Sequence, residues 1–147
     1  MEFNARFGDP EAQALLPRLT SDFGEVCLAC TSGDLGGGSL EWSPRPCVSV
    51  VLASGGYPGS YDTGVPIAGL DGAAALDDTF VFHAGTTQRD GEVVTSGGRV
   101  LAVSSLGDTF GEARARAYEA AEHIAFEGKH LRTDIALRAE KEEVRPG

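Results

Sequence analysis

The sequence predicts an α+β fold, with an antiparallel β-sheet or partial barrel of four or more strands and flanking helices. Short runs rich in β-branched and aromatic residues, such as CVSVVLA and TFVFHA, are bounded by Gly, Pro, Ser or Asp. Apolar residues at helical spacing lie before and after these runs. With 147 residues, 41% of them hydrophobic and 23% charged, the chain falls in the range of one globular domain with a sizeable core.

The N-terminal segment predicts a strand and then a helix. Residues 2–7 alternate polar and apolar side chains, so an extended strand would place the two kinds on opposite faces. Gly8 would end this strand. Asp9 can cap the helix that follows over residues 11–16, and Pro17 should interrupt that helix.

A second helix is expected from Ser21, its N-cap, to a stop at Gly33. Its apolar side includes Phe23, Cys27 and Cys30. We interpret the two cysteines as buried, inert small hydrophobes rather than as a metal or redox pair, because the sequence has no second Cys or His pair at ligand spacing.

The middle of the chain predicts the sheet. Strands are expected over residues 40–42, 47–53, 79–84, 92–95 and 99–105. An Asp-Gly turn signal precedes the fourth strand and a Gly-Gly pair precedes the fifth. These strands would close into an antiparallel sheet.

The last third predicts a long helix. Thr109 and Glu112 form a capping box at its start. A stripe of apolar residues follows at steps of three and four: Phe110, Ala113, Ala117, Ala121 and Ile124. Gly128 should end the helix, and a short turn or helix and a charged tail should follow.

The charge and hydropathy exclude two classes of partner. The net charge of −10 argues against a nucleic-acid partner, because such a surface must neutralise phosphates. No apolar run is long enough to span a bilayer, and the N-terminus lacks the pattern of a secretory signal. We therefore expect no nucleic acid and no membrane as partners, and a soluble, cytoplasmic protein.

The N-terminal strand carries the first candidate site. Glu2 and Asn4 would place hard oxygens on one strand face, about 7 Å apart along the backbone, which suits one Mg²⁺ that bridges substrate phosphates. Arg6 follows on the same face and offers a planar fork for a phosphate or acyl phosphate. From spacing alone, the same alternation also fits a solvated strand face.

Two glycine-rich loops are further candidates. In SGGYPGSY, Gly55 and Gly56 would let backbone N–H groups approach an anion, and in TSGGR the pair Gly98 and Arg99 adds a positive charge beside a turn. Each loop can equally be a structural turn. Asp9 fits a helix cap and a substrate contact equally well.

The longer string EFNARFGDPE resembles the end of the ATP-grasp domain in glycinamide ribonucleotide synthetase, the phosphoribosylamine-glycine ligase family. Further blocks resemble that enzyme's C-terminal domain in order and spacing: VVLASGGYPGSYDTGVPIAGL, VFHAGT, VTSGGRVLAVSSLGDT and AYEAAEHIAFEGKHLRTDIA. The resemblance covers essentially the whole chain. It implies that residues 1–16 end an ATP-grasp domain and that residues 17–147 form the C-terminal α+β domain of the ligase.

The resemblance also implies a reaction, which is ATP-dependent amide formation between glycine and 5-phosphoribosylamine in purine biosynthesis. Glu2 and Asn4 would bind Mg²⁺ or Mn²⁺ under ATP, and Arg6 would be the catalytic cation beside the phosphates. The loops with Gly55, Gly56, Gly98 and Arg99 would face the cleft, together with Asp9, and contact substrate there.

The chain departs from the family in length, since no glycine-rich phosphate loop or nucleotide-binding lysine precedes the Glu-x-Asn strand. We therefore expect an incomplete ATP pocket, an isolated chain that is inactive, and the N-terminal domains of the same ligase as partner. Two alternatives stay open. The chain could be the C-terminal piece of another ATP-grasp ligase, or a non-catalytic binding module that pairs with a separate N-terminal chain.

Overall fold

The computed structural model describes residues 5–34 and 39–143. Its helices are α1 (Glu11–Leu15), α2 (Phe23–Ser32), α3 (Leu70–Ala74), α4 (Phe110–His123) and α5 (Leu137–Glu143), with a 3-10 helix η1 (Leu16–Arg18) directly after α1. Its strands are β1 (Cys47–Ala53), β2 (Thr79–His83), β3 (Thr86–Arg89), β4 (Glu92–Thr95) and β5 (Arg99–Leu106). The predicted α+β class is confirmed, with antiparallel sheets of three and two strands. None of the helices within these ranges has the length and apolar character needed to cross a bilayer.

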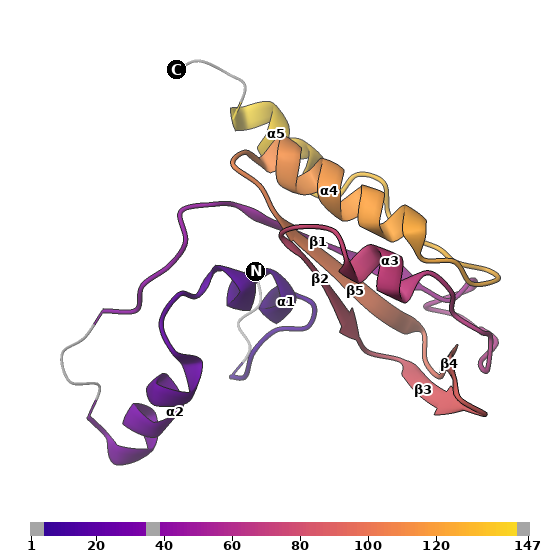
Figure 1. Ribbon diagram of the computed structural model, residues 1–147, viewed down its shortest axis with the longest axis horizontal. Coiled ribbons are helices and arrows are strands. Elements are labelled where there is room, and N and C mark those ends of the chain that lie inside the picture. The colour runs from indigo at the N-terminus through magenta and orange to yellow at the C-terminus, as the bar shows by residue number, and fades with distance from the viewer. Residues whose placement is uncertain (1–4, 35–38, 144–147) are drawn as a thin grey trace.

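The main sheet has the order β1-β5-β2, so β5 is its central strand. Val48, Val50 and Leu52 of β1 are buried, and Val48 and Val50 pack with alanines of α4. On the opposite face, Ser49 and Val51 line a small cavity with Pro10, which directly precedes α1. The sheet is thus covered by α4 on one face and approached by the N-terminal segment on the other (Figure 1).

The strands expected over residues 47–53, 79–84, 92–95 and 99–105 all form, within one residue at their ends. Instead of one sheet, however, β4 pairs with β3, a strand that the sequence reading omitted. Residues 40–42 contribute only one bridge, between Leu19 and Trp42. The Gly-Gly turn between β4 and β5 redirects the chain, so β5 pairs with β1 and β2 instead.

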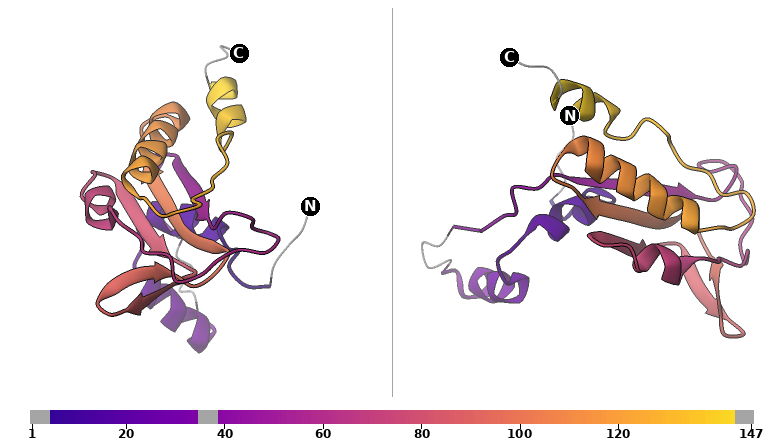
Figure 2. Two further views of the ribbon diagram at one scale, coloured as in Figure 1. Left: turned by 90° about the vertical axis from the view of Figure 1, so that its right-hand side faces the viewer. Right: turned by 45° about the horizontal axis from the view of Figure 1, so that its top comes forward.

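Helix α4 lies along the sheet, as the right-hand view of Figure 2 shows. Thr109 caps it by accepting a hydrogen bond from the N–H of Glu112 at 3.1 Å. The Glu112 carboxylate accepts from the N–H of Asp108, one residue before the cap, at 3.0 Å. Ala113 and Ala117 are fully buried, as the apolar stripe predicts, and their small side chains let the helix approach the sheet closely.

The prediction that α4 ends at Gly128 was wrong, because the helix ends at His123. The chain then becomes extended, and Ala125 exchanges two backbone hydrogen bonds with Ala68, at 2.9 and 3.0 Å. Lys129 donates to the carbonyl of Ile124 at 2.6 Å and so satisfies one of the oxygens left free at the helix end. Long-range pairing therefore outweighs the local helical signal.

Helix α2 stands apart from the sheet and has no buried residue (Figures 1 and 2). Its stop at Gly33 is confirmed, with φ of 70°, but its N-cap is Asp22 rather than Ser21. The expectation that Cys27 and Cys30 are buried was wrong, since both are exposed. The described residues cover this helix only in part. The Phe7 ring contacts that of Phe23, with centroids 5.8 Å apart, and Ser39 and Leu40 line a cavity beside the helix.

The opening strand expected over residues 2–7 is not formed in its described part. Ala5 and Arg6 form a bend, and Phe7 has no regular structure. A strand needs a partner for its backbone N–H and C=O groups, and no neighbouring strand among the described residues supplies one. Residues 2–4 lie outside the described residues. The helix predicted over residues 11–16 forms as α1, and Pro17 falls within the 3-10 turn that follows it.

An ion cluster fastens the segment before β1 to the sheet. Arg45 donates two hydrogen bonds to the carboxylate of Asp78, at 2.9 and 2.6 Å, and contacts Asp108 at 3.1 Å. Arg116 of α4 donates to the same Asp78 carboxylate at 2.9 Å. The hydrogen bond from Arg45 is the main cause that lowers the pKa of Asp78, with Arg116 contributing.

Substituting Asp78→Asn tests this cluster. A folded-state pKa below the unfolded value of about 3.9 gives stability that is present above about pH 4 and lost as the pH falls further. We expect Asp78→Asn to lower the free energy of unfolding by about 1 kcal/mol at pH 7 and to converge with the unsubstituted chain in acid. Asn tolerates the left-handed backbone found at this position, with φ of 57°.

Urea unfolding from pH 7 to pH 2 would measure both proteins, with Asp77→Asn, an exposed neighbour, as the matched control. A constant difference between Asp78→Asn and the unsubstituted chain across this range would show that the charge of Asp78 does not stabilise the fold.

Candidate functional site

The two glycine-rich loops lie together at one end of the sheet. Ser54, directly after β1, is buried; its N–H donates to the carbonyl of Gly98 at 2.8 Å and its hydroxyl donates to that of Gly97 at 3.0 Å. Because β1 and β5 are antiparallel, the end of one strand meets the start of the other, with Ala53 opposite Arg99. The sheet register therefore brings Gly55, Gly56, Gly98 and Arg99 into one loop cluster, made of residues 54–61 and 95–99.

Packing inside the cluster explains its glycines. Gly98 is buried, and a Cβ on it would overlap the ring of Tyr57. Gly56 has φ of 94°, a left-handed conformation that favours glycine. At Gly55, a Cβ would lie 2.8 Å from the carbonyl oxygen of Gly128, so the turn after α4 is pressed against this loop. The structural-turn interpretation therefore accounts for these glycines, whatever ligand the loops contact.

The VFHAGT block, residues 81–86, is hydrogen-bonded to the loop cluster. The N–H of Gly85 donates to the carbonyl of Arg99 at 2.8 Å, and the N–H of Ser96 donates to that of Gly85 at 2.8 Å. His83 shares a hydrogen bond with the hydroxyl of Thr86 at 2.9 Å. The sequence pattern of this block predicts no role for it in the site. Its contribution is to hold the main chain on both sides of the Gly97–Gly98 turn.

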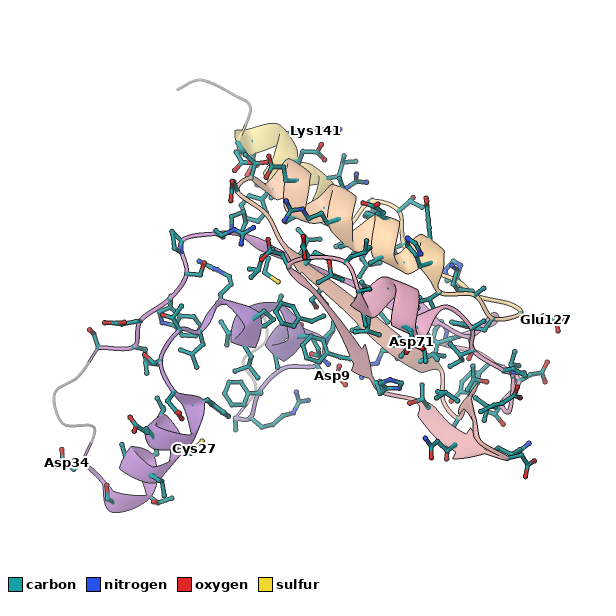
Figure 3. All side chains as sticks on the ribbon, in the orientation of Figure 1. Asp9, Cys27, Asp34, Asp71, Glu127 and Lys141 are labelled. Carbon is teal, nitrogen blue, oxygen red and sulfur yellow. The ribbon has the colours of Figure 1, made fainter. Side chains whose placement is uncertain are left out.

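Arg99 is paired with Asp9. Its Nη1 donates to the backbone oxygen of Asp9 at 2.8 Å, and its Nη2 donates to the Asp9 carboxylate at 3.1 Å. Both side chains remain partly exposed, at 40% and 51%. Asp9, labelled in Figure 3, precedes α1 but does not cap it, because no side-chain hydrogen bond caps this helix.

The described contacts do not connect Arg6 or the predicted metal ligands to this cluster. Arg6 is exposed, and its Nη1 donates to the carbonyl of the adjacent Phe7 at 2.8 Å. Glu2 and Asn4 lie outside the described residues. The structure thus brings Asp9 together with the glycine loops, whereas none of the described contacts joins Arg6 to them.

A cavity of about 240 Å³ opens beside the loop cluster. Ser54 and Gly55 form one side, Glu127 and Gly128 another, and Asp62 and Val65 complete the lining. Sequence reasoning missed Asp62 and Glu127, because an isolated carboxylate in a loop carries no recognisable spacing. Only the approach of the turn near Gly128 to Gly55 brings the two carboxylates to one cavity.

Neither a Cys47 thiolate nor a metal-binding cluster is found among the described residues. Burial raises the pKa of the Cys47 thiol to about 11, so this cysteine is not a thiolate near neutral pH. Among residues 5–34 and 39–143, no group of three or more His, Cys, Asp or Glu side chains could hold a metal ion. The polar groups at the described cluster are backbone N–H groups and Arg99, with the Asp62 and Glu127 carboxylates at the neighbouring cavity.

Comparison with known proteins identifies the family. The model described as phosphoribosylglycinamide synthetase, C domain, matches residues 47–138. The chain belongs to this family. It is similar to the phosphoribosylamine-glycine ligase of Caldanaerobacter subterraneus subsp. tengcongensis, at 51% identity over 92% of this chain, and to that of Rhodopirellula baltica, at 48% identity over 95%.

A solved structure agrees with the fold. The crystal structure of phosphoribosylamine-glycine ligase from Thermotoga maritima matches 91% of this chain with a TM-score of 0.77 and 36% sequence identity. The resemblance stated from the sequence is therefore confirmed. This chain corresponds to the C-terminal portion of these ligases and spans 32% of the length of each of the three relatives named here.

The close contact at Gly55 predicts the effect of Gly55→Ala. The added methyl group would press on a backbone oxygen of Gly128 that cannot rotate away, so the free energy of unfolding should fall by about 1–3 kcal/mol. Gly111→Ala is the matched control, because its Cβ would meet no atom closer than 3.7 Å in the first turn of α4. Urea unfolding of both variants measures the difference. Equal stability of Gly55→Ala and the unsubstituted chain would contradict the packing described here.

Proposed function

We propose that this chain is the C-terminal part of a phosphoribosylamine-glycine ligase of the cytoplasm. That enzyme joins glycine to 5-phosphoribosylamine at the expense of ATP and yields glycinamide ribonucleotide, ADP and phosphate in purine biosynthesis. The observation that carries the proposal is membership of the C-domain family over residues 47–138, together with 51% identity to a ligase over 92% of the chain.

Within this enzyme, the loop cluster would receive the phosphate of the ribosylamine. Gly55 and Gly56 are exposed, and no described residue accepts a hydrogen bond from either N–H. Consecutive N–H groups at a left-handed turn form a concave site for an anion. The Arg99 guanidinium adds the matching charge. Gly98 would contribute indirectly, by leaving room for the Tyr57 ring.

The N-terminal residues would serve the ATP side of the reaction. Glu2 and Asn4 offer a carboxylate and an amide oxygen, a donor set that suits Mg²⁺ or Mn²⁺ when nucleotide phosphates supply the other ligands. The bound metal would neutralise charge on the phosphoryl group as it moves from ATP to glycine. Arg6 would stabilise the same charge from the protein side.

The remaining parts of the ATP pocket would come from the portion of the ligase that precedes this region in the relatives. Two observations favour placing the boundary between the portions near residue 46 rather than residue 16. The family match begins at residue 47. Helix α2 has no buried residue and exposes apolar side chains, including Phe23 at 41% and Leu28 at 70%. We infer that the N-terminal portion covers α2.

Complementation tests the proposed function. We would measure ADP release that depends on glycine and 5-phosphoribosylamine, for this chain alone, for the N-terminal portion of a relative's ligase alone, and for the two combined or fused as a completed ligase. We expect activity only in the completed ligase, because each part would hold only some of the ATP and substrate contacts. Glu2→Ala should reduce this activity by at least about a hundredfold.

The intact relative ligase is the positive control for this assay. Activity of this chain alone would contradict an incomplete ATP pocket. A completed ligase that assembles but remains inactive beside an active control would argue against the ligase function.

Thiol labelling tests the inferred cover over α2 without relying on activity. Cys27 and Cys30 are exposed in this chain, and Cys27 is labelled on α2 in Figure 3, away from the sheet. Both should react with a maleimide in the isolated chain and become at least about tenfold slower in the completed ligase, because buried thiols are inert.

Cys47 is the internal control for this labelling, because this first residue of β1 is already partly buried and should react slowly in both samples. Unchanged labelling of Cys27 and Cys30 in an active completed ligase would place the interface elsewhere.

A further inference from the structure

The contact between Asp9 and Arg99 joins two segments that lie 90 residues apart. Asp9 holds one edge of the guanidinium with two oxygens, its backbone carbonyl at 2.8 Å and its carboxylate at 3.1 Å. A guanidinium carries further N–H donors in the same planar fork. No other described residue accepts from them, and 40% of the side chain is exposed.

Both ends of Arg99 are therefore held. Its main chain lies opposite Ala53 of β1, and its carbonyl accepts from Gly85. Its side chain is held by Asp9 while 40% of it stays exposed. Ordering a free arginine side chain upon binding costs conformational entropy. A guanidinium that is already oriented avoids most of this cost.

The Asp9 carboxylate is itself engaged on both oxygens. Its Oδ2 accepts from Arg99, and its Oδ1 accepts from the side-chain amide of Gln13 on α1, at 3.2 Å. Both oxygens of this carboxylate are therefore already engaged in contacts within the chain. Asp9 therefore links α1, through Gln13, to the side chain of Arg99 at the start of β5.

We propose that Asp9 is a positioning residue that orients the Arg99 guanidinium toward the phosphate of the ribosylamine substrate. The inference rests on the proposed function and deepens it. Asp9 follows the segment that carries Glu2 and Asn4 by only a few residues. The contact thus links the ATP side of the reaction to the loop cluster on the substrate side.

A double-mutant cycle in the completed ligase tests this role. Asp9→Ala should raise the KM for 5-phosphoribosylamine about tenfold and leave the KM values for ATP and glycine unchanged. Asp9→Asn keeps a side-chain oxygen that can accept from Arg99, so its effect should be clearly smaller. Arg99→Ala should raise the same KM at least as much as Asp9→Ala, and adding Asp9→Ala to it should have no further effect.

Binding of ribose 5-phosphate gives a second readout that does not need turnover, and its dissociation constant should rise in the same order across the variants. Arg138→Ala is the matched control, because it removes an exposed arginine whose ion pair with Glu142 lies within α5. This control should leave both readouts unchanged.

The outcomes separate this inference from the proposed function. Additive effects of Asp9→Ala and Arg99→Ala would mean that Asp9 acts independently of Arg99. An unchanged KM for 5-phosphoribosylamine in Asp9→Ala would mean that the contact has only a structural role. Either result overturns the inference while the ligase function stands. A completed wild-type ligase with neither activity nor ribose 5-phosphate binding would overturn both.

Discussion

The pairing of β1 with β5 is the interaction on which the rest of this structure depends. Antiparallel register from Cys47 opposite Leu106 to Ala53 opposite Arg99 buries alternate residues of β1 under α4. The same register places the end of β1 beside the start of β5. The core and the loop cluster are therefore consequences of a single set of backbone hydrogen bonds, and a shift by one residue would disrupt both.

Small residues let the surrounding elements close on this pair. Ala113 and Ala117 bring α4 onto the sheet, and Gly55 allows the turn at Gly128 to approach the first loop. Two ion pairs attach further segments to the sheet. Arg45 pairs with Asp78 and attaches the segment before β1. Arg99 pairs with Asp9 and attaches the segment before α1. Of these ion pairs, the one between Asp9 and Arg99 brings the N-terminal segment to the candidate site.

Helix α2 lies outside the packed part of this chain. The sheet and α4 share two clusters of buried apolar residues, whereas α2 contributes no buried residue. The exposed apolar residues of this helix are the basis of our proposal that another part of the ligase covers it. The family comparison agrees, because the chain spans 32% of the length of its relatives.

Local sequence patterns were enough to predict most secondary-structure elements and the family. The strands β1, β2, β4 and β5, the Thr109 cap and the Gly33 stop follow from alternation, capping and turn chemistry, which act over a few residues. The blocks around EFNARFGDPE and SGGYPGSY were long enough to identify the ligase family, which the comparisons confirmed. Long-range packing, in contrast, sets the early end of α4 at His123, the exposure of Cys27 and Cys30, and the pairing of Asp9 with Arg99. Each of these depends on which distant segment lies alongside, and a contact across 90 residues leaves no trace in local spacing.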